Sequence, residues 1–117
     1  MPHSLMLFKN RLTEEAKRLR AELLQDLSQS EHFFEREIAL KLKATPDINW
    51  IELLQDKIYP TLNKKVIRLN KVEAALCQFE QGVYGICADC EDAISLLKLE
   101  QDPTEQRCLP CADKSAV

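Results

Sequence analysis

Apolar residues recur every three or four positions through the first third of the chain. They are Leu12, Ala16, Leu19, Leu23, Leu27, Phe34, Ile38 and Leu42. This spacing is close to the 3.6-residue period of a helix with one buried face. No glycine or proline occurs from residue 3 to residue 45, and charges of both signs occupy the intervening positions. The pattern predicts one long helix, which needs a partner along its length.

A second apolar series has the 4-3 spacing of a coiled-coil seam. Its members are Ile58, Leu62, Leu69, Val72, Leu76 and Phe79, with Lys65 at one seam position beside Val66. We expect this segment to be the partner of the first helix. Pro60 lies inside it, and the loss of one backbone hydrogen bond predicts a kink near Asp56. That kink is either a bend that the packing tolerates or a hinge that changes the direction of the tip.

Residues 44–50 join the two helical segments. Pro46 suits the first position of a helix capped by Thr45, whereas Asn49 is followed three residues later by Glu52, as in a capping box. Either cap makes this stretch a tight reversal. We expect residues 1–81 to form an antiparallel coiled-coil hairpin with its tip at about 44–50 and its open end near the C-terminal cysteines.

Composition supports a mainly helical chain of one domain or little more. The chain has 117 residues, of which 45% are hydrophobic and 30% are charged, and only two are glycines. Few residues are therefore free to adopt a positive φ. No run of 18 apolar residues is present, and the N-terminus lacks the basic region and cleavage site of a secretory signal. We expect a cytoplasmic protein.

Four of the five cysteines form two pairs near the C-terminus. Cys87-Ala88-Asp89-Cys90 is followed, after 17 residues, by Cys108-Leu109-Pro110-Cys111. Two such pairs turn four sulfurs toward one point and are typical of a tetrahedral zinc site. Four protein ligands leave no open position, so we expect one structural Zn²⁺, with iron in a rubredoxin-like site as the alternative. A redox role is disfavoured, because no strand–helix context surrounds either pair.

The residues around the cysteine pairs support a small metal-dependent module. Little apolar surface is available after Cys87, so metal binding supplies most of the folding energy. The only glycines, Gly82 and Gly85, can end the preceding helix and allow a sharp turn into the first pair. We expect Cys77, on the apolar face of the coil, to be a small buried residue. A short packed helix or turn is expected from Ile94, Leu96, Leu97 and Leu99.

Charge is unevenly distributed along the chain. Residues 1–43 carry eight basic and seven acidic side chains, residues 44–86 carry five of each, and residues 87–117 carry three basic and seven acidic. Four zinc-bound thiolates add a further charge of about −2 to the last segment. A surface that binds DNA is expected to be positive, because phosphate neutralisation and counterion release drive that affinity. We therefore expect a protein partner and no direct DNA binding.

A basic stripe lies on one face of the second helix. Its members, Lys57, Lys64, Arg68 and Lys71, follow at intervals of seven, four and three residues. One interpretation is a solvated face that pairs with acidic residues of the first helix. The other is a docking surface for an acidic groove on a large partner, in which case binding is sensitive to salt.

The C-terminal motif carries a family resemblance. It consists of residues 82–90 (Gly-Val-Tyr-Gly-Ile-Cys-Ala-Asp-Cys), Ile94, Lys98-Leu99, Pro103-Thr104 and Cys108-Leu109-Pro110-Cys111. This motif resembles the DksA/TraR C4-type zinc-finger family of bacterial RNA polymerase-binding factors. The preceding hairpin is similar to the family's coiled coil. The resemblance implies a mainly α fold, with a long antiparallel helical hairpin followed by a four-cysteine zinc finger over residues 82–117.

The same resemblance implies a function. It predicts a transcriptional regulator, not an enzyme, that binds RNA polymerase through the secondary channel and does not read DNA sequence. Longer members of the family carry Asp-x-x-Asp-x-Ala at the tip, and the corresponding positions here are Ala44, Asp47 and Asn49, with Trp50 adding an apolar contact. Asp47 also suits a helix first turn through the helix dipole. The alternative function is a zinc-stapled coiled-coil adaptor for another protein.

The resemblance also bears on nucleotide binding. Longer members of the family complete a site for guanosine tetraphosphate (ppGpp) against the polymerase with basic residues. Lys71 matches the coil position, whereas Asp102 and Ala112 fall at the zinc-region positions and cannot neutralise phosphate. We expect a weak response to ppGpp or none, as in the shorter family members that act without it.

Overall fold

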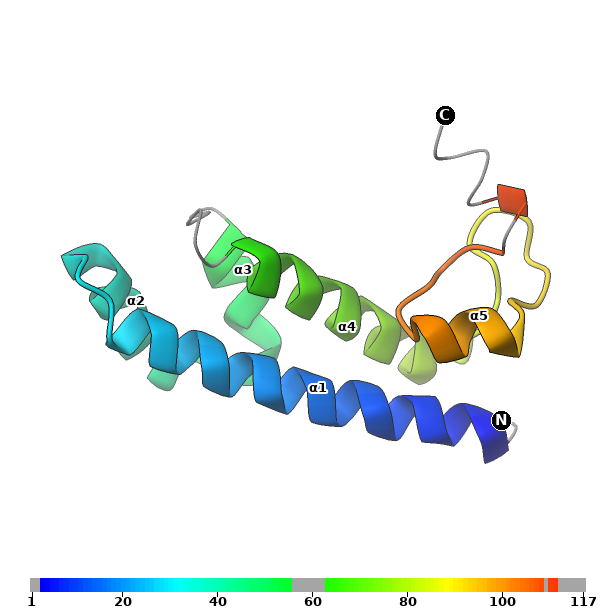
Figure 1. Ribbon diagram of the computed structural model, residues 1–117, viewed down its shortest axis with the longest axis horizontal. Coiled ribbons are helices and arrows are strands. Elements are labelled where there is room, and N and C mark those ends of the chain that lie inside the picture. Colours follow the sequence, from blue (N-terminus) through cyan, green and yellow to red (C-terminus); the bar gives the residue numbers. More distant parts are fainter. Residues whose placement is uncertain (1–2, 56–62, 109, 112–117) are drawn as a thin grey trace. The chain divides into compact units, whose positions relative to one another are not determined.

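The computed structural model is built from helices (Figure 1). It describes residues 3–55, 63–108 and 110–111. The helices are α1 (His3–Ser28), α2 (Phe33–Lys43), the short 3-10 helix η1 (Asp47–Asn49), α3 (Trp50–Gln55), α4 (Asn63–Gln81) and α5 (Leu96–Gln101). Those residues form no strand, only an isolated bridge between Ile86 and Ala93. The mainly helical fold is confirmed. No helix in the described ranges is long and apolar enough to cross a membrane.

The chain divides into two compact units. The finger unit comprises Met1–Glu15 and Lys71–Val117, and the helical unit comprises Ala16–Asn70. The finger unit thus holds the start of α1, the end of α4 and all the cysteines. The helical unit holds the remainder of both helices together with α2, η1 and α3. The boundary between residues 81 and 82, drawn from the motif, stays a prediction.

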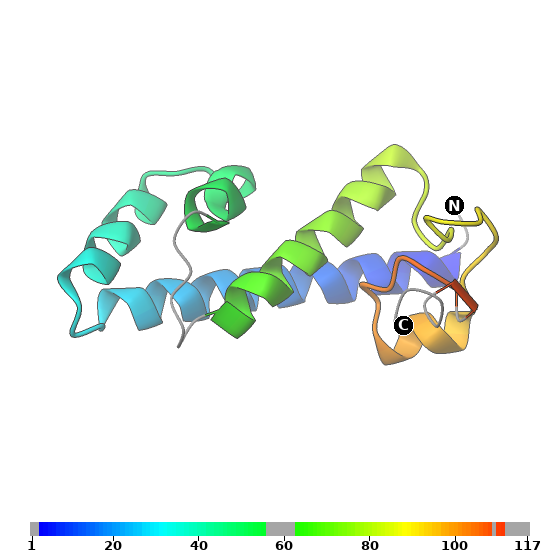
Figure 2. The same ribbon diagram turned by 90° about the horizontal axis from the view of Figure 1, so that it is seen from above.

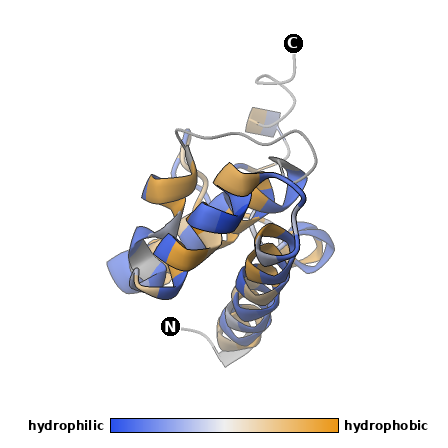
Figure 3. Ribbon diagram, turned by 90° about the vertical axis from the view of Figure 1, so that its left-hand side faces the viewer, coloured by the Kyte–Doolittle hydropathy of each residue, from blue (hydrophilic) through white to orange (hydrophobic). Residues whose placement is uncertain are grey.

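The buried stripe of α1 is the one that the sequence predicts. Leu12 is buried in the finger unit, and the helical unit buries Ala16, Leu19, Leu23 and Leu27. Within each unit, α4 runs in the opposite direction to α1 (Figures 1 and 2). Hydrophilic and hydrophobic residues alternate along these helices (Figure 3), as expected when each helix buries a single face.

One continuous helix over residues 3–45 was expected, and this expectation is wrong. Helix α1 ends at Ser28, and α2 begins only at Phe33. Between them, the Ser30 hydroxyl accepts a hydrogen bond from the His32 N–H (3.0 Å), and the Ser30 carbonyl accepts one from the Arg36 guanidinium (2.7 Å). A serine side chain that bonds nearby backbone groups favours a turn over a helix interior. The break therefore forms without glycine or proline.

The break also changes which face of the next helix is buried. Helix α2 buries Glu35, Ile38, Ala39 and Leu42, which are related by i, i+3, i+4 and i+7. Phe34 was expected on this face, but it is 74% exposed, and its ring meets that of Phe33 at 6.1 Å. The buried stripe restarts at residue 35, so Phe34 falls on the outer side of α2.

Helix α4 buries a stripe slightly rotated from the predicted seam. The buried residues are Val66, Leu69, Val72, Ala75 and Phe79. Lys65 lies at the edge of this stripe, where its ammonium donates to the Asp26 carboxylate at 2.6 Å, and this hydrogen bond raises the pKa of Lys65. Ile58, Leu62 and the kink predicted at Pro60 lie outside the described residues.

Cys77 is exposed, so the prediction of a buried core cysteine is wrong. It follows the fully buried Ala75 by two residues, which is about 200° around the helix. The rotation of the seam toward Val66 and Ala75 therefore moves Cys77 to the solvent side of α4.

Candidate metal centre

The four paired cysteines come together in the finger unit. Their Sγ atoms all lie within 4.8 Å of one another, and the Cys90 and Cys108 Sγ atoms are 3.5 Å apart. A tetrahedral site with Zn–S distances of about 2.3 Å places its sulfurs about 3.8 Å apart. The four thiols, Cys87, Cys90, Cys108 and Cys111, therefore fit one structural Zn²⁺. Cys87 is buried, and the other three lie nearer the surface.

Two glycines direct the chain from α4 into this site. The Gly82 N–H donates to the Phe79 carbonyl (3.2 Å), and the Val83 N–H donates to the Gln78 carbonyl (2.9 Å). With φ of 74° at Gly82, these bonds form a Schellman cap that ends α4. Gly85 also has a positive φ, of 80°. Both positions favour glycine because a Cβ atom is strained there, and the predicted role of the glycines agrees with this geometry.

Backbone hydrogen bonds shape the first cysteine pair. The Cys87 N–H donates to the Asp92 carbonyl (2.7 Å), and the Glu91 N–H returns to the Cys87 carbonyl (3.0 Å). Glu91 closes this loop with a φ of 65°. The Ile94 N–H then donates to the Gly85 carbonyl (2.7 Å). These bonds close the loop that carries Cys87 and Cys90, whose Sγ atoms lie within 4.8 Å of each other.

Tyr84 anchors the module from the inside. Its ring stacks on Phe79 at 3.9 Å, and its hydroxyl donates to the Pro103 carbonyl at 2.7 Å. Phe8 of α1 lies 6.4 Å from the same ring. Burial raises the pKa of the Tyr84 hydroxyl to about 12. Tyr84 thus connects α1, the end of α4 and the segment that leads to the second cysteine pair.

The short helix expected between the cysteine pairs is α5. It buries Leu99, and Ile94 is buried just before it, but Leu96 and Leu97 are exposed, contrary to the packing expected for them. A six-residue helix on a small module has only one face to bury. The Arg11 guanidinium of α1 donates to the Glu100 carbonyl (3.2 Å), which fastens the end of α5.

The ionisation of the thiols also suits a cation. Burial raises the pKa of Cys87, but hydrogen bonds from backbone N–H groups, chiefly that of Cys108, outweigh it and lower this pKa to about 6. Hydrogen bonds with the Cys108 and Cys87 sulfurs raise the pKa of Cys111 to about 12. The backbone at Asp92 lowers the pKa of Cys90, yet the Cys108 and Cys87 sulfurs outweigh it and raise that pKa. One thiolate thus suppresses ionisation of its neighbours, and a divalent cation removes this conflict.

The predicted tip residues lie in the helical unit, between α2 and α3. Asp47 is exposed, with its carboxylate 3.8 Å from the Arg20 guanidinium of α1, and Asn49 is exposed as well. Trp50 differs from the role expected for it, because it is only 5% exposed and its indole N–H donates to the Thr45 carbonyl (3.1 Å). The ring is therefore part of the core of this unit.

Of the two caps predicted for the next helix, the one at Thr45 is not formed, and the one at Asn49, which directly precedes α3, stays a prediction. The Thr45 hydroxyl donates to the Lys41 carbonyl at 2.6 Å, so it completes the end of α2 and does not begin the next helix. Pro46 precedes η1 instead, with no side-chain cap. The reversal at 44–50 therefore joins the two short helices α2 and α3.

The basic stripe is described in part. Lys64 and Lys71 are exposed on α4, Arg68 is half-buried, and Lys57 lies outside the described residues. Lys64 and Arg68 belong to the helical unit and Lys71 to the finger unit. A docking role for these residues stays a prediction.

Comparison with known families identifies the cysteine module. Residues 82–115 match the family described as the prokaryotic dksA/traR C4-type zinc finger. This segment is a DksA/TraR zinc finger. The resemblance seen in the motif is confirmed, and so is a zinc site made by four cysteines.

The DksA/TraR finger lies within a fold that is already known. The solved structure of transcription factor DksA2 from Pseudomonas aeruginosa is similar to this chain, with a TM-score of 0.62. The similarity covers 97% of this chain and 83% of that chain at 19% sequence identity. At that identity, the likeness establishes the fold alone. Comparison with curated proteins finds no match.

Proposed function

We propose that this protein is a transcriptional regulator that binds RNA polymerase directly through the secondary channel, without reading DNA sequence. The observation that carries the proposal is a DksA/TraR zinc finger at residues 82–115 in a chain whose fold is similar to that of transcription factor DksA2. In this proposal the protein is cytoplasmic and has no catalytic residues, and its one Zn²⁺ is structural.

The charge of the finger supports a protein partner. Residues 87–117 carry three basic and seven acidic side chains, and four zinc-bound thiolates make the segment more negative. Phosphate backbones repel such a surface, because nucleic-acid affinity depends on cations that replace counterions. Direct DNA binding through the finger is therefore disfavoured.

The proposed contact surface has two parts. The first is the exposed turn that carries Asp47 and Asn49, which corresponds to the family's coiled-coil tip. The second is the basic stripe, of which Lys64 and Lys71 are exposed. Arginine and lysine on one helix face suit an acidic groove of a large protein and give an association rate that falls with salt. Trp50 is not included, because its ring is buried.

The proposal includes a weak response to ppGpp or none. At one zinc-region position, the Asp102 carboxylate accepts hydrogen bonds from the Thr104 N–H (3.0 Å) and hydroxyl (2.7 Å). A carboxylate is negatively charged, and this one is bonded within its own loop, so Asp102 cannot neutralise a phosphate. Lys71 alone then supplies the positive charge that the resemblance assigns to such a site.

A specific observation favours a second candidate function. Asp47, the one acid retained at the tip, lies 3.8 Å from Arg20 of the same unit. This ion pair is what a structural role for Asp47 predicts, and it supports the alternative of a zinc-stapled adaptor for another protein. The adaptor would use the same helical surface and would not perturb the polymerase active centre.

Purified core polymerase and a ribosomal promoter test the proposal. We expect the zinc-loaded protein to co-purify with core polymerase, to compete with a known secondary-channel factor, and to change transcript yield in vitro. Asp47→Ala should reduce the transcriptional effect, whereas Glu52→Ala, which removes an exposed acid from α3, should not. Binding without competition would favour the adaptor, and a protein that does not bind core polymerase contradicts the main proposal.

A further inference from the structure

The two cysteine pairs of the finger are joined by contacts that do not involve sulfur. The Arg107 guanidinium donates through Nε to Asp89 Oδ2 at 2.9 Å. Beside this ion pair, the Ala88 N–H donates to the Gln106 carbonyl at 2.7 Å. Asp89 lies between the two cysteines of the first pair, and Arg107 directly precedes the first cysteine of the second pair. The two loops are therefore connected one residue away from the metal ligands on each side.

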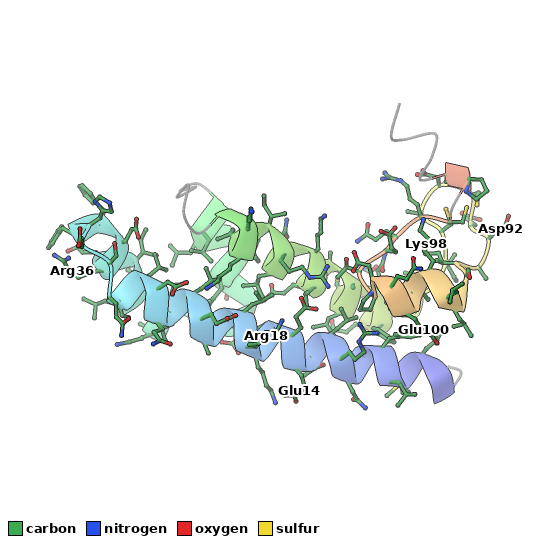
Figure 4. All side chains as sticks on the ribbon, viewed as in Figure 1. Glu14, Arg18, Arg36, Asp92, Lys98 and Glu100 are labelled. Atoms are coloured by element: carbon green, nitrogen blue, oxygen red, sulfur yellow. The ribbon has the colours of Figure 1, made fainter. Side chains whose placement is uncertain are left out.

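A third side chain supports this connection from α5. The Lys98 ammonium donates to the Arg107 carbonyl at 3.0 Å and lies 3.6 Å from the Glu105 carboxylate. Its side chain is only 17% exposed, so it is held in place by its surroundings. Figure 4 shows Lys98 on α5, next to the cysteine-rich loops, and Asp92 at the outer side of these loops. Lys98 thus fixes the backbone of the residue that makes the ion pair.

We infer that Asp89, Arg107 and Lys98 form a positioning layer that holds the two cysteine pairs at ligand distance and thereby sets the affinity for zinc. The side chains of Asp89 and Arg107 are 46% and 48% exposed, so their ion pair adds little to global stability. The ion pair acts instead by position: it keeps Cys90 and Cys108 adjacent, in the arrangement that a tetrahedral ion requires.

Electrostatics give the layer a second effect. A zinc ion with four thiolates carries a charge of about −2, so a carboxylate without a cationic partner beside it disfavours the bound ion. Asp89 is an anion beside this centre, and it is tolerable there because Arg107 neutralises it. Removal of a nearby carboxylate that makes no such pair should leave zinc affinity unchanged or raise it. Loss of Asp89 should lower the zinc affinity, because losing the ion pair that positions the loops outweighs the benefit of removing a negative charge.

Asp92 provides the matched control for this distinction. Like Asp89, it is an exposed acid within two residues of Cys90, and its backbone carbonyl, not its side chain, accepts the hydrogen bond from Cys87. Asp92→Asn and Asp89→Asn therefore remove the same charge from the same loop. Only the second removes the ion pair.

The test is a competition titration of zinc against a chromophoric chelator, with the full chain. We expect Asp89→Asn and Arg107→Gln each to weaken zinc binding by about tenfold, at the lower end of the effects seen for partners of metal ligands. The double variant should lose less than the product of the two single losses, because both remove one interaction. Asp92→Asn should bind zinc at least as tightly as the natural chain.

The inference would be overturned by equal affinities for Asp89→Asn and Asp92→Asn, or by fully multiplicative losses in the double variant. Cobalt spectra at saturating metal provide the second measurement. Variants of Asp89 or Arg107 keep all four thiolate ligands, so they should still give the spectrum of a tetrathiolate cobalt site, but only at a higher cobalt concentration. A variant that never reaches it also contradicts the inference. Zinc affinity is measured without polymerase, so this test stands apart from that of the proposed function.

Discussion

The finger unit and the helical unit hold their folds together in different ways. The finger unit gathers four thiols around one point and adds Tyr84 and a set of backbone hydrogen bonds across short loops. The helical unit depends on an apolar stripe of Leu19, Leu23 and Leu27, with charges at its edges. A metal site is specified by a few residues at fixed spacing, whereas an apolar stripe tolerates several phases and helix lengths. The difference predicts separate responses to metal loss and to core mutation.

Zinc removal should have the largest effect and should be confined to the finger unit. Structural zinc contributes on the order of 10 kcal/mol to the folding of small fingers. We expect a chelator, or Cys87→Ser, to abolish stoichiometric zinc and to remove hydrogen-exchange protection from residues 82–111, while residues 16–28 stay protected. Elemental analysis and exchange mass spectrometry make the measurement. Equal loss of protection in residues 82–111 and 16–28 would show that the two units do not respond separately to metal loss.

A cavity in the helical unit should have the next largest effect and leave the metal site intact. Leu23 is fully buried, and Leu23→Ala should cost about 2–5 kcal/mol of unfolding free energy. Leu40→Ala is the control, because Leu40 is exposed and a surface change costs about 0.5 kcal/mol or less. Denaturant unfolding gives both values. Zinc stoichiometry should not change, and a Leu23→Ala chain that no longer binds zinc would disprove this separation.

Tyr84→Phe should destabilise the finger unit by a smaller amount. It removes the hydrogen bond to the Pro103 carbonyl, worth about 1 kcal/mol, and keeps the stacked ring. The hydroxyl has a pKa of about 12 in the folded protein and 10.0 in its ordinary state, so the folded state binds this proton more tightly. The stability that this tighter proton binding gives the folded state is complete below pH 10 and is lost as the pH rises from 10 toward 12.

Alkaline titration, followed by tyrosinate absorbance and by circular dichroism, tests this prediction for Tyr84. The late tyrosinate phase should disappear in Tyr84→Phe. An ordinary titration of Tyr84 near pH 10 in the folded protein would show that its burial has no effect on ionisation.

The Arg20–Asp47 pair should have the smallest effect on stability. Its atoms are 3.8 Å apart, and the Asp47 side chain is 69% exposed, so Asp47→Ala should cost about 0–1 kcal/mol. Arg20→Gln and the double variant complete a thermodynamic cycle in denaturant at low and high salt. A coupling energy well above this range would assign Asp47 a structural role and weaken its proposed role at the tip.

The finger was the part of the fold that could best be predicted from the sequence. The two cysteine pairs, the two glycines and the short helix between the pairs each follow from local spacing, and the structure places them accordingly. The role of Tyr84 was missed, although an aromatic residue between two glycines was a visible signal. The Asp89–Arg107 pair was not visible, because its members are 18 residues apart and meet only when the two loops are joined.

The helical unit was harder to predict from the sequence. An apolar period predicts a helix and its buried face, and the burial of Leu19, Leu23 and Leu27 agrees with it. It does not report where a helix ends when no glycine or proline marks the position. The turn at Ser30 depends on hydrogen bonds to His32 and Arg36, which compete closely with helix continuation.

The sequence alone determined that the chain is helical, that four of its cysteines bind one metal ion, and that its finger is of the DksA/TraR type. These properties depend on residue types at short, fixed separations. Tertiary structure decided the exposure of Phe34 and Cys77 and the burial of Trp50. Each of these depends on which helix faces meet, and a rotation by a single residue, about 100°, is enough to exchange a buried position for an exposed one.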